Sequence, residues 1–197
     1  MKYLSLDIET TGLEEGAKII EFACVPVNVK TKEILKDLSF HTYVQCPSFE
    51  ELEPHLNDFV KKHNKELIQK AHEVGISLKE LQDQLSAYLT SPEIVEFFEG
   101  KPPVILGKSL SALDIPLLKR DLGWDYFMKH FHHQVRDVSS IAGYMVDVGL
   151  LPPNCISSSQ LAKKFLEKKD VDHTALGDSI DMGDIYIKLV YIKKEEG

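Results

Sequence analysis

Apolar and polar residues alternate in a pattern that divides the chain into an N-terminal group of strands and a longer helical region. In residues 3–9 (YLSLDIE), the alternation places Leu4, Leu6 and Ile8 on one face of a strand. The apolar stretches at 18–30 and 33–45 predict a second and a third strand, joined by short polar connections. This order predicts that the sheet begins as a meander of neighbouring strands.

Beyond Pro54, apolar residues recur at helical spacing. The segment ELIQKAHEVG ends at a glycine, and Ser77 with Glu80 forms a capping-box pattern at the start of the next helix. The short apolar run PPVILGKS predicts a buried strand. Further helical segments, one of them entered through a short strand, are expected at 114–123, 132–149, 157–167 and 173–194. Strands followed by alternating helices and strands predict one α/β domain over residues 1–197, with a mixed sheet.

The composition is that of an ordinary globular domain, with 43% hydrophobic and 27% charged residues. No apolar run approaches the roughly 20 residues that cross a bilayer, and the N-terminus lacks the pattern of a signal peptide. Three widely spaced cysteines favour reduced thiols, so we expect a cytoplasmic protein without membrane contacts. The net charge of −8 argues against a protein that coats nucleic acid with a basic surface, but it permits one that binds a few nucleotides through metal ions.

The first predicted strand carries two acidic residues close together. Asp7 and Glu9 are two positions apart, so their side chains point to the same side of the strand. Neighbouring carboxylates repel each other, and burying them without a counter-charge is costly. The pair is therefore either solvated at the end of the strand or arranged around a cation.

Three further residues favour the cation. Asp114 lies where a buried strand turns into a helix, and His173 and Asp178 lie at the entry and in the first turns of the last helix. Each alone has an ordinary explanation, such as an acid at a helix N-terminus or a polar residue at a helix start. Their order and local contexts together indicate one site.

The chain resembles the DEDDh-type 3′→5′ exonucleases, which have a ribonuclease H-like fold. DIETTGL, LSALDIPLL and HTALGD match the three motifs of that family, and the match runs over nearly the whole length. Within the class, the single-domain length, the helical insert at 66–89 and the segment RDVSSIAGYM are most similar to oligoribonuclease. The resemblance implies a mixed five-stranded sheet flanked by helices, and an enzyme that releases nucleoside 5′-monophosphates.

The resemblance also implies a catalytic centre built on two Mg²⁺ or Mn²⁺ ions, because carboxylate oxygens are the hard ligands that these ions prefer. In the family, the residue matching Asp7 bridges both ions and the one matching Glu9 lies on the nucleophile side. Asp114 and Asp178 would complete the coordination. An imidazole titrates near neutral pH, so His173 would act as the general base. The ions would activate the water and stabilise the leaving 3′-oxygen.

Substrate contacts are expected around the first motif and in the insert. The loop after Glu9 would approach the terminal nucleotide, with Gly12 allowing a tight turn and Leu13 wedging against the terminal bases. Phe59 and His63 are both candidates for the aromatic residue that the family carries in the insert. The predicted substrate-binding residues are Thr10, Gly12, Leu13, Lys108, Ser139 and His63.

The chain departs from oligoribonuclease in the substrate pocket. Lys108 stands where that family usually has asparagine. His133 and Gln134 stand where it has a Tyr–Arg pair, and Arg136 is displaced by two residues. These changes affect the substrate assignment and leave the reaction type unchanged.

Short oligoribonucleotides are the expected substrate, with RNA favoured over DNA. The alternative is a 3′→5′ exonuclease for single-stranded DNA, of the proofreading or phage type. A non-catalytic binding module is less favoured, because all five site residues are present. The histidines at 130, 132 and 133 are expected to be strand and pocket residues, without a metal. The sequence does not decide whether the protein forms a homodimer. The apolar side chains at 185, 187, 189 and 190 are expected to face the protein's own core.

Overall fold

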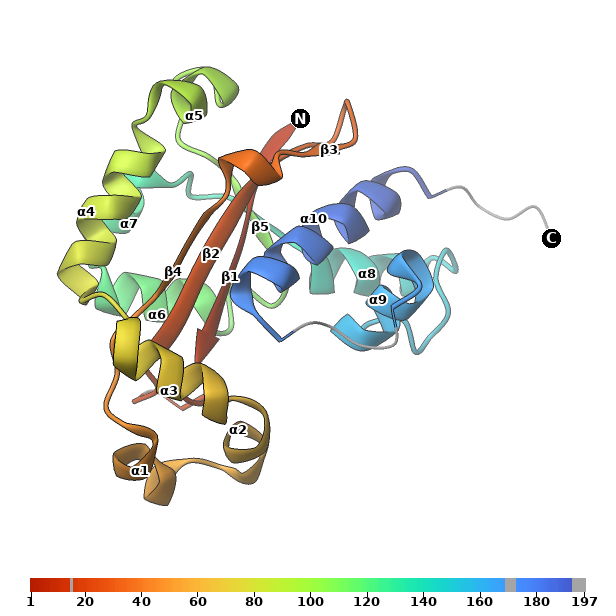
Figure 1. Ribbon diagram of the computed structural model, residues 1–197. Helices are drawn as coiled ribbons and strands as arrows, with labels where there is room; N and C mark the ends of the chain where they lie inside the picture. The colour runs from red at the N-terminus through yellow and green to blue at the C-terminus, as the bar shows by residue number, and fades with distance from the viewer. Residues whose placement is uncertain (15, 169–172, 193–197) are drawn as a thin grey trace.

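The computed structural model describes residues 1–14, 16–168 and 173–192 (Figure 1). Its strands are β1 (Lys2–Thr10), β2 (Ile19–Asn28), β3 (Glu33–Ile34), β4 (Phe40–Tyr43), β5 (Ile105–Gly107) and β6 (Val135–Asp137). Its helices are α1 (Phe49–Leu52), α2 (Asp58–His63), α3 (Lys65–Val74), α4 (Leu78–Leu89), α5 (Pro92–Phe97), α6 (Asp114–Asp121), α7 (Trp124–His130), α8 (Val138–Asp147), α9 (Ser158–Leu166) and α10 (Ala175–Val190). Short 3₁₀ turns lie at Lys36–Leu38 and Glu53–His55. None of the helices in these ranges is long and apolar enough to cross a membrane.

Strand β1 lies at the centre of a mixed sheet, which confirms the predicted fold class. The strand order is β3-β2-β1-β5-β6, and β4 also pairs with β2. β1 runs antiparallel to β2 and parallel to β5. The register sets Glu9 opposite Glu21, and the β1–β2 pairing is shifted between Glu9 and Thr10.

The described sheet has six strands rather than the expected five. The stretch 33–45, expected as one strand, is interrupted by the 3₁₀ turn Lys36–Leu38. The chain therefore pairs with β2 twice. β3 pairs with the C-terminal end of β2, and β4 pairs with residues nearer the start of β2. The apolar pattern alone could not show the interruption, because both flanking pieces have strand-like composition.

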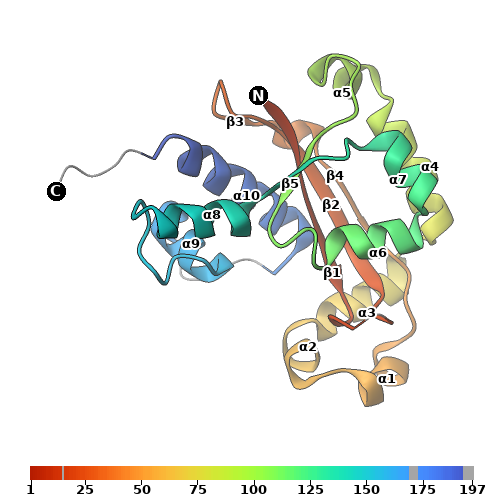
Figure 2. The ribbon, with the colours of Figure 1, turned by 180° about the vertical axis from the view of Figure 1, so that it is seen from behind.

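The two faces of the sheet are covered by different groups of helices (Figures 1 and 2). Leu4, Leu6 and Ile8 share one face of β1, as predicted, and pack under α4, α6 and α7. The opposite face packs against α8, α9 and α10 through a second apolar cluster. Its α10 members include the buried Ile185, Ile187 and Leu189, which face the protein's own core as expected. Val190, expected to do the same, is 38% exposed at the last position of the helix.

Helices α1 to α3 cover the sheet near the start of β2 and the end of β1 (Figure 1). Ile20, Val60 and Ile68 are buried in this third apolar cluster. α3 ends at Gly75, as predicted, where a Cβ atom would lie 2.6 Å from the backbone nitrogen of Gln45. Only glycine permits that close approach of the two backbones.

The later helices follow the predicted order, with two additions. α4 begins with the predicted capping box of Ser77 and Glu80. The short helices α5 and α7 were not expected, because six or seven residues give too little periodicity to be recognised. The last helix was expected to reach residue 194. α10 ends at Val190, and residues 193–194 lie outside the described residues.

Candidate active site

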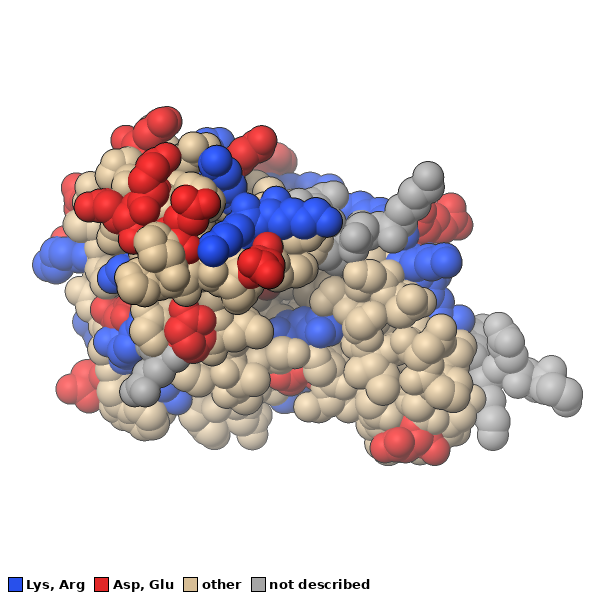
Figure 3. Space-filling view, turned by 90° about the horizontal axis from the view of Figure 1, so that it is seen from below, with Lys and Arg blue, Asp and Glu red and all other residues tan. Residues whose placement is uncertain are grey.

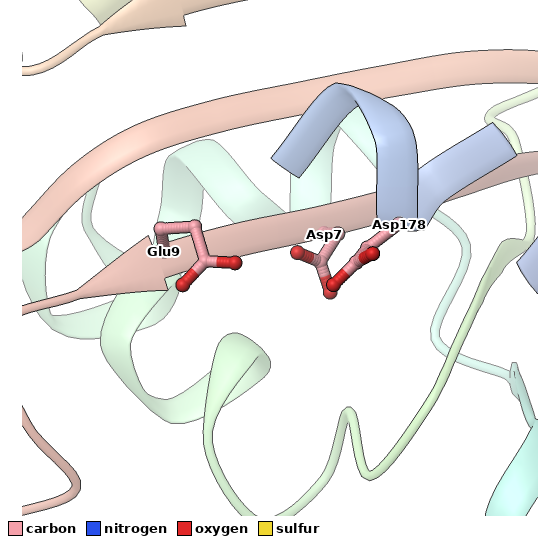
Figure 4. Close-up of side chains that lie close together, drawn as sticks. All are labelled: Asp7, Glu9 and Asp178. Carbon is pink, nitrogen blue, oxygen red and sulfur yellow. The ribbon is translucent and has the colours of Figure 1, made fainter. Parts of the chain in front are cut away.

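The packing of α10 along β1 brings the first and third sequence motifs together. The hydroxyl of Ser5 donates a buried hydrogen bond of 2.6 Å to the carbonyl oxygen of Ser179. Asp7 is the next residue of β1 on the same face, and Asp178 precedes Ser179 in α10. With Ser5 against Ser179, the side chain of Asp178 lies beside that of Asp7 (Figure 4).

Asp7, Glu9 and Asp178 form a compact group of carboxylates (Figure 4). Each offers one oxygen atom, and these oxygens all lie within 4.8 Å of one another. Among the described residues, they are the only group of three or more His, Cys, Asp or Glu side chains that come this close. Three oxygen donors of this kind suit a hard divalent cation.

Asp114 approaches the same group from the first turn of α6, where it is only 5% exposed. Its carboxylate accepts hydrogen bonds from its own backbone N–H and from that of Ile8 in β1. The preceding strand β5 lies so close to β1 that a Cβ atom on Gly107 would be 2.7 Å from the carbonyl oxygen of Leu6. The charge of Asp114 also raises the pKa of Asp7, so Asp114 lies near the close group of three carboxylates without being a member of it.

The electrostatics of this group favour the binding of a cation. Burial raises the pKa of Asp7 well above its usual value, and the charges of Asp114, Glu9 and Asp178 raise it further. Burial is also the main cause that raises the pKa of Glu9 to about 8, with Asp178 next, and that of Asp114 to about 7. Four acids that repel one another in a desolvated place would be stabilised together by divalent cations.

The ring of His173 lies beside α2, and His173 precedes the helix that carries Asp178. Its φ of +51° is in the left-handed region, which is uncommon for a residue other than glycine and is enriched at functional sites. Its ring centroid is 5.9 Å from that of His63 and 6.5 Å from that of Phe59. Phe59 and His63 stack on each other at 4.5 Å, and Phe59 is 59% exposed. Both candidates for the aromatic of the insert therefore lie beside His173.

Side chains of the loop after Glu9 hold its backbone through hydrogen bonds. The hydroxyl of Thr10 donates to the carbonyl oxygen of Gly12 at 2.6 Å, and that of Thr11 accepts from the backbone N–H of Lys18. Gly12 does not adopt a left-handed φ, and the three atoms nearest to a Cβ atom there belong to the side chain of Glu14. Substrate binding by Thr10 and Gly12 stays a prediction. Leu13 is 79% exposed, which leaves it free to contact a ligand.

The predicted residues Lys108 and Ser139 lie just beyond the ends of β5 and β6. The hydroxyls of Ser139 and Ser109 are 2.9 Å apart, and Asp137 accepts from the backbone N–H groups of both serines. Lys108 is half-buried at the start of this loop. Substrate binding by Lys108 and Ser139 stays a prediction.

Other candidates from the sequence lie away from the acids. The guanidinium of Arg136 lies 5.7 Å from the ring centroid of Tyr3, toward the other end of β1. His132 stacks on His133 at 4.3 Å, and its Nδ1 accepts from the N–H of Gln134. His130, His132 and His133 form no close group of metal-ligand atoms among the described residues.

Two polar residues of the site were missed by the sequence analysis. Asn64, which is 7% exposed, donates to the carbonyl oxygen of Thr10 and hydrogen-bonds the carboxylate of Glu9, lowering the pKa of Glu9 against the effect of burial. Glu21 is 1% exposed and lies on β2, opposite Glu9. One signal was available for Glu21, since it is the single charged residue within the apolar run IIEFACVPV.

The family of this chain is shown by comparison with known proteins. The RNase_T model, which describes an exonuclease domain, matches residues 4–186. The chain belongs to this exonuclease family. Its members normally use divalent metal ions, which agrees with the acid cluster. Comparison with curated protein sequences gives no significant match.

The fold is shared with solved exonuclease structures at low sequence identity. The nuclease domain of 3′hExo, a DEDDh family member bound to rAMP, is 18% identical, with a TM-score of 0.63, and the match covers 96% of this chain and 91% of that one. Cell-death related nuclease 4 is 17% identical, with a TM-score of 0.66 and coverage of 96% and 63%. E. coli exonuclease I in complex with a dT13 oligonucleotide is 13% identical, with a TM-score of 0.63 and coverage of 97% and 41%. The chain thus spans less than two thirds of the last two proteins. These likenesses confirm the ribonuclease H-like exonuclease fold.

Proposed function

We propose that this nuclease is a metal-dependent 3′→5′ exonuclease that releases nucleoside 5′-monophosphates from short or single-stranded nucleic acid, with oligoribonucleotides preferred. The observation that carries this proposal is the meeting of Asp7, Glu9 and Asp178 within 4.8 Å, with Asp114 beside them. This arrangement reproduces the acid set that the DEDDh resemblance assigns to phosphodiester hydrolysis.

The roles of the residues follow from their chemistry. Asp7, Glu9, Asp114 and Asp178 would hold Mg²⁺ or Mn²⁺, two ions by resemblance to the family. Such ions, when bound, lower the pKa of a bound water and offset the charge that develops on the phosphate oxygens. His173 would accept the proton of the attacking water as general base. Its neighbours Phe59 and His63 would bound the space in which that water and the scissile phosphate lie.

The surroundings of His173 support short substrates with unpaired bases. The exposed ring of Phe59 is supported from behind by His63, so it offers a flat apolar face on which a base can stack. Leu13 offers a second exposed apolar side chain next to the first motif. On the face seen from below, Lys and Arg side chains are interspersed with Asp and Glu side chains (Figure 3). With a net charge of −8, binding would depend on a few terminal nucleotides more than on a long phosphate backbone.

Single-stranded DNA is the second candidate substrate, and the position of Arg136 favours it. In oligoribonuclease, an arginine before the DVS segment contacts the phosphate of very short RNA. Here Arg136 packs over Tyr3 instead. Without that contact to the terminal phosphate, the site would not select for very short RNA by this means.

Turnover of 5′-labelled substrates tests the proposal. An RNA dimer, an RNA pentamer, a 20-nucleotide RNA and a 20-nucleotide single-stranded DNA would be compared with Mg²⁺, with Mn²⁺ and with EDTA. We expect metal-dependent release of nucleoside 5′-monophosphates from the 3′ end, fastest for the two short RNAs. Faster cleavage of the DNA would identify the second candidate. Absence of cleavage with every substrate and metal would refute an exonuclease.

Two variants separate base stacking from general effects on the protein. Phe59→Ala should raise KM for the RNA dimer about tenfold with little change in kcat, since stacking contributes about 1–3 kcal/mol per base. Trp124→Ala is the matched control, because Trp124 is 60% exposed and lies on α7, away from the acids. An equal rise of KM in both variants would contradict stacking on Phe59.

A further inference from the structure

Glu21 is a buried carboxylate that has a different set of partners from the four acids. Both of its oxygens accept short contacts from other elements. Oε1 lies 2.6 Å from Nε2 of His41 in β4, and Oε2 accepts a hydrogen bond of 2.9 Å from the backbone N–H of Ala175. Glu21 is not a member of the close group formed by Asp7, Glu9 and Asp178 in the described structure.

The bond to Ala175 ties strand β2 to the beginning of α10. Ala175 is the first residue of this helix, where backbone N–H groups have no partner within the helix. A carboxylate is also favoured there by the positive end of the helix dipole. Thr174 caps the N–H of Gly177, and Glu21 supplies the acceptor for Ala175. The start of α10 is thereby fixed to the sheet at a position directly beside Glu9.

The residues on either side of Ala175 are those that the proposed chemistry needs. His173 precedes Ala175 by two positions, and Asp178 follows it by three. A shift of the first turn of α10 would move both side chains relative to Asp7 and Glu9, which are held in the sheet. Displacements of about 1 Å in such a site are enough to cost about a hundredfold in rate.

His41 holds the carboxylate in this orientation. Its ring packs edge-on against Tyr43 at 5.0 Å, and β4 is itself paired with β2. Burying a carboxyl side chain beside other acids is costly unless it has partners, and an apolar residue would pack at this position with less penalty. The contacts of Glu21 are therefore better explained by orientation of the site than by stability.

We propose that Glu21 is a positioning residue, which sets His173 and Asp178 against the acids of β1 by binding the N–H of Ala175. His41 orients Glu21 for this contact. The inference rests on the proposed function for the chemistry of the site. The geometric part concerns the placement of Asp178 and is tested by metal binding alone.

The test compares Glu21→Gln with Glu21→Ala. Glutamine keeps an oxygen that can accept from Ala175, and its amide nitrogen can face His41, whereas alanine loses both contacts. Asp181→Ala is the matched control, because Asp181 is a buried carboxylate of α10, 5% exposed, that contacts Lys168 at 2.9 Å rather than the acids. For each protein, Mn²⁺ binding is measured by electron paramagnetic resonance, kcat and KM with an RNA dimer, and the melting temperature.

We expect Glu21→Ala to weaken Mn²⁺ binding at least about tenfold, which is the magnitude of one lost hydrogen bond to a carboxylate. The same variant should lower kcat by a similar or larger factor and change KM less than about threefold. Glu21→Gln should restore most of kcat. Asp181→Ala should lower the melting temperature without weakening Mn²⁺ binding.

Two results would overturn the positioning role. One is unchanged Mn²⁺ binding and kcat in Glu21→Ala. The other is equal impairment in Glu21→Gln and Glu21→Ala, which would assign the effect to charge. If the unaltered protein binds Mn²⁺ but cleaves nothing, the proposed function fails, and the Mn²⁺ affinities of the two variants still decide the role of Glu21.

Discussion

The contact between β1 and α10 has two ends that differ in chemistry. At the end near Tyr3, the ring of Tyr3 meets that of Tyr186 edge-on at 5.3 Å, and the hydroxyl of Ser5 bonds to the carbonyl of Ser179. At the other end, the same face of β1 presents Asp7 and Glu9 to α10. One end is apolar with its polar groups satisfied, and the other gathers like charges.

This difference separates the part of the contact that stabilises the fold from the part that carries the proposed chemistry. Aromatic burial and a satisfied hydrogen bond hold α10 on the sheet without any ligand. The acids oppose folding when no cation is bound, because burial and mutual repulsion raise the pKa of Asp7 and Glu9. The packing at the tyrosine end therefore offsets the repulsion among the carboxylates at the acid end.

The largest expected effect comes from removing one charge at the acid end. Asp7→Asn should lower kcat by more than about a thousandfold, the scale seen when a central catalytic group is lost. The same variant should melt at a higher temperature than the unaltered protein in EDTA at neutral pH, because it relieves repulsion. Turnover of a labelled RNA dimer and thermal unfolding check the two parts. A lower melting temperature in EDTA would contradict the repulsive character of this end.

The opposite result is expected at the tyrosine end. Tyr3 is 7% exposed and packs in the second apolar cluster, so Tyr3→Ala should lower the free energy of unfolding by about 3 kcal/mol. At a temperature where the variant stays folded, kcat should change less than about threefold, since the acids are undisturbed. Chemical denaturation and steady-state kinetics measure both. A loss of activity comparable to that of Asp7→Asn would show that the two ends are not separable.

The pH dependence of the metal-free protein sharpens the comparison. The pKa of Glu9 is raised from 4.5 to about 8, and that of Asp114 from 3.8 to about 7. Raised pKa values in the folded state give stability at low pH that is lost as the pH rises through the folded values. In EDTA, the protein should therefore melt several degrees lower at a pH of about 8.5 than at about 5.5, and saturating Mn²⁺ should remove this difference. Asp7→Asn should show a shallower dependence. A melting temperature that rises with pH in EDTA would be the contrary finding.

The smallest effect is expected from the hydrogen bond between Ser5 and Ser179 at the tyrosine end. Ser5→Ala removes the donor to Ser179 and should cost about 1 kcal/mol of unfolding free energy. Activity should stay within about twofold, because packing on both sides of Ser5 still holds α10 in place. Denaturant titration and turnover of the RNA dimer suffice as measurements. A large loss of activity would indicate that this bond, rather than Glu21, sets the position of Asp178.

Much of the site could be predicted because it depends on local spacing. Asp7 and Glu9 share a face by the period of a strand, and the capping box of Ser77 and Glu80 is a local pattern. Asp114 at a strand–helix junction follows from the same kind of reasoning. The contacts missed by the sequence analysis are those made between distant segments. They include the bond from Asn64 to Thr10.

The sequence by itself determined the class of fold, the order of most elements and the acids of the site. The tertiary structure decided that 33–45 pairs with β2 in two pieces, that Phe59 and His63 both lie beside His173, and that Arg136 lies away from the acids. It also decided that Glu21 meets Ala175, a residue 154 positions later. Periodicity and capping act over a few residues, so they can be recognised in the chain. Which buried polar groups meet depends on how the helices pack on the sheet, and no local pattern records that.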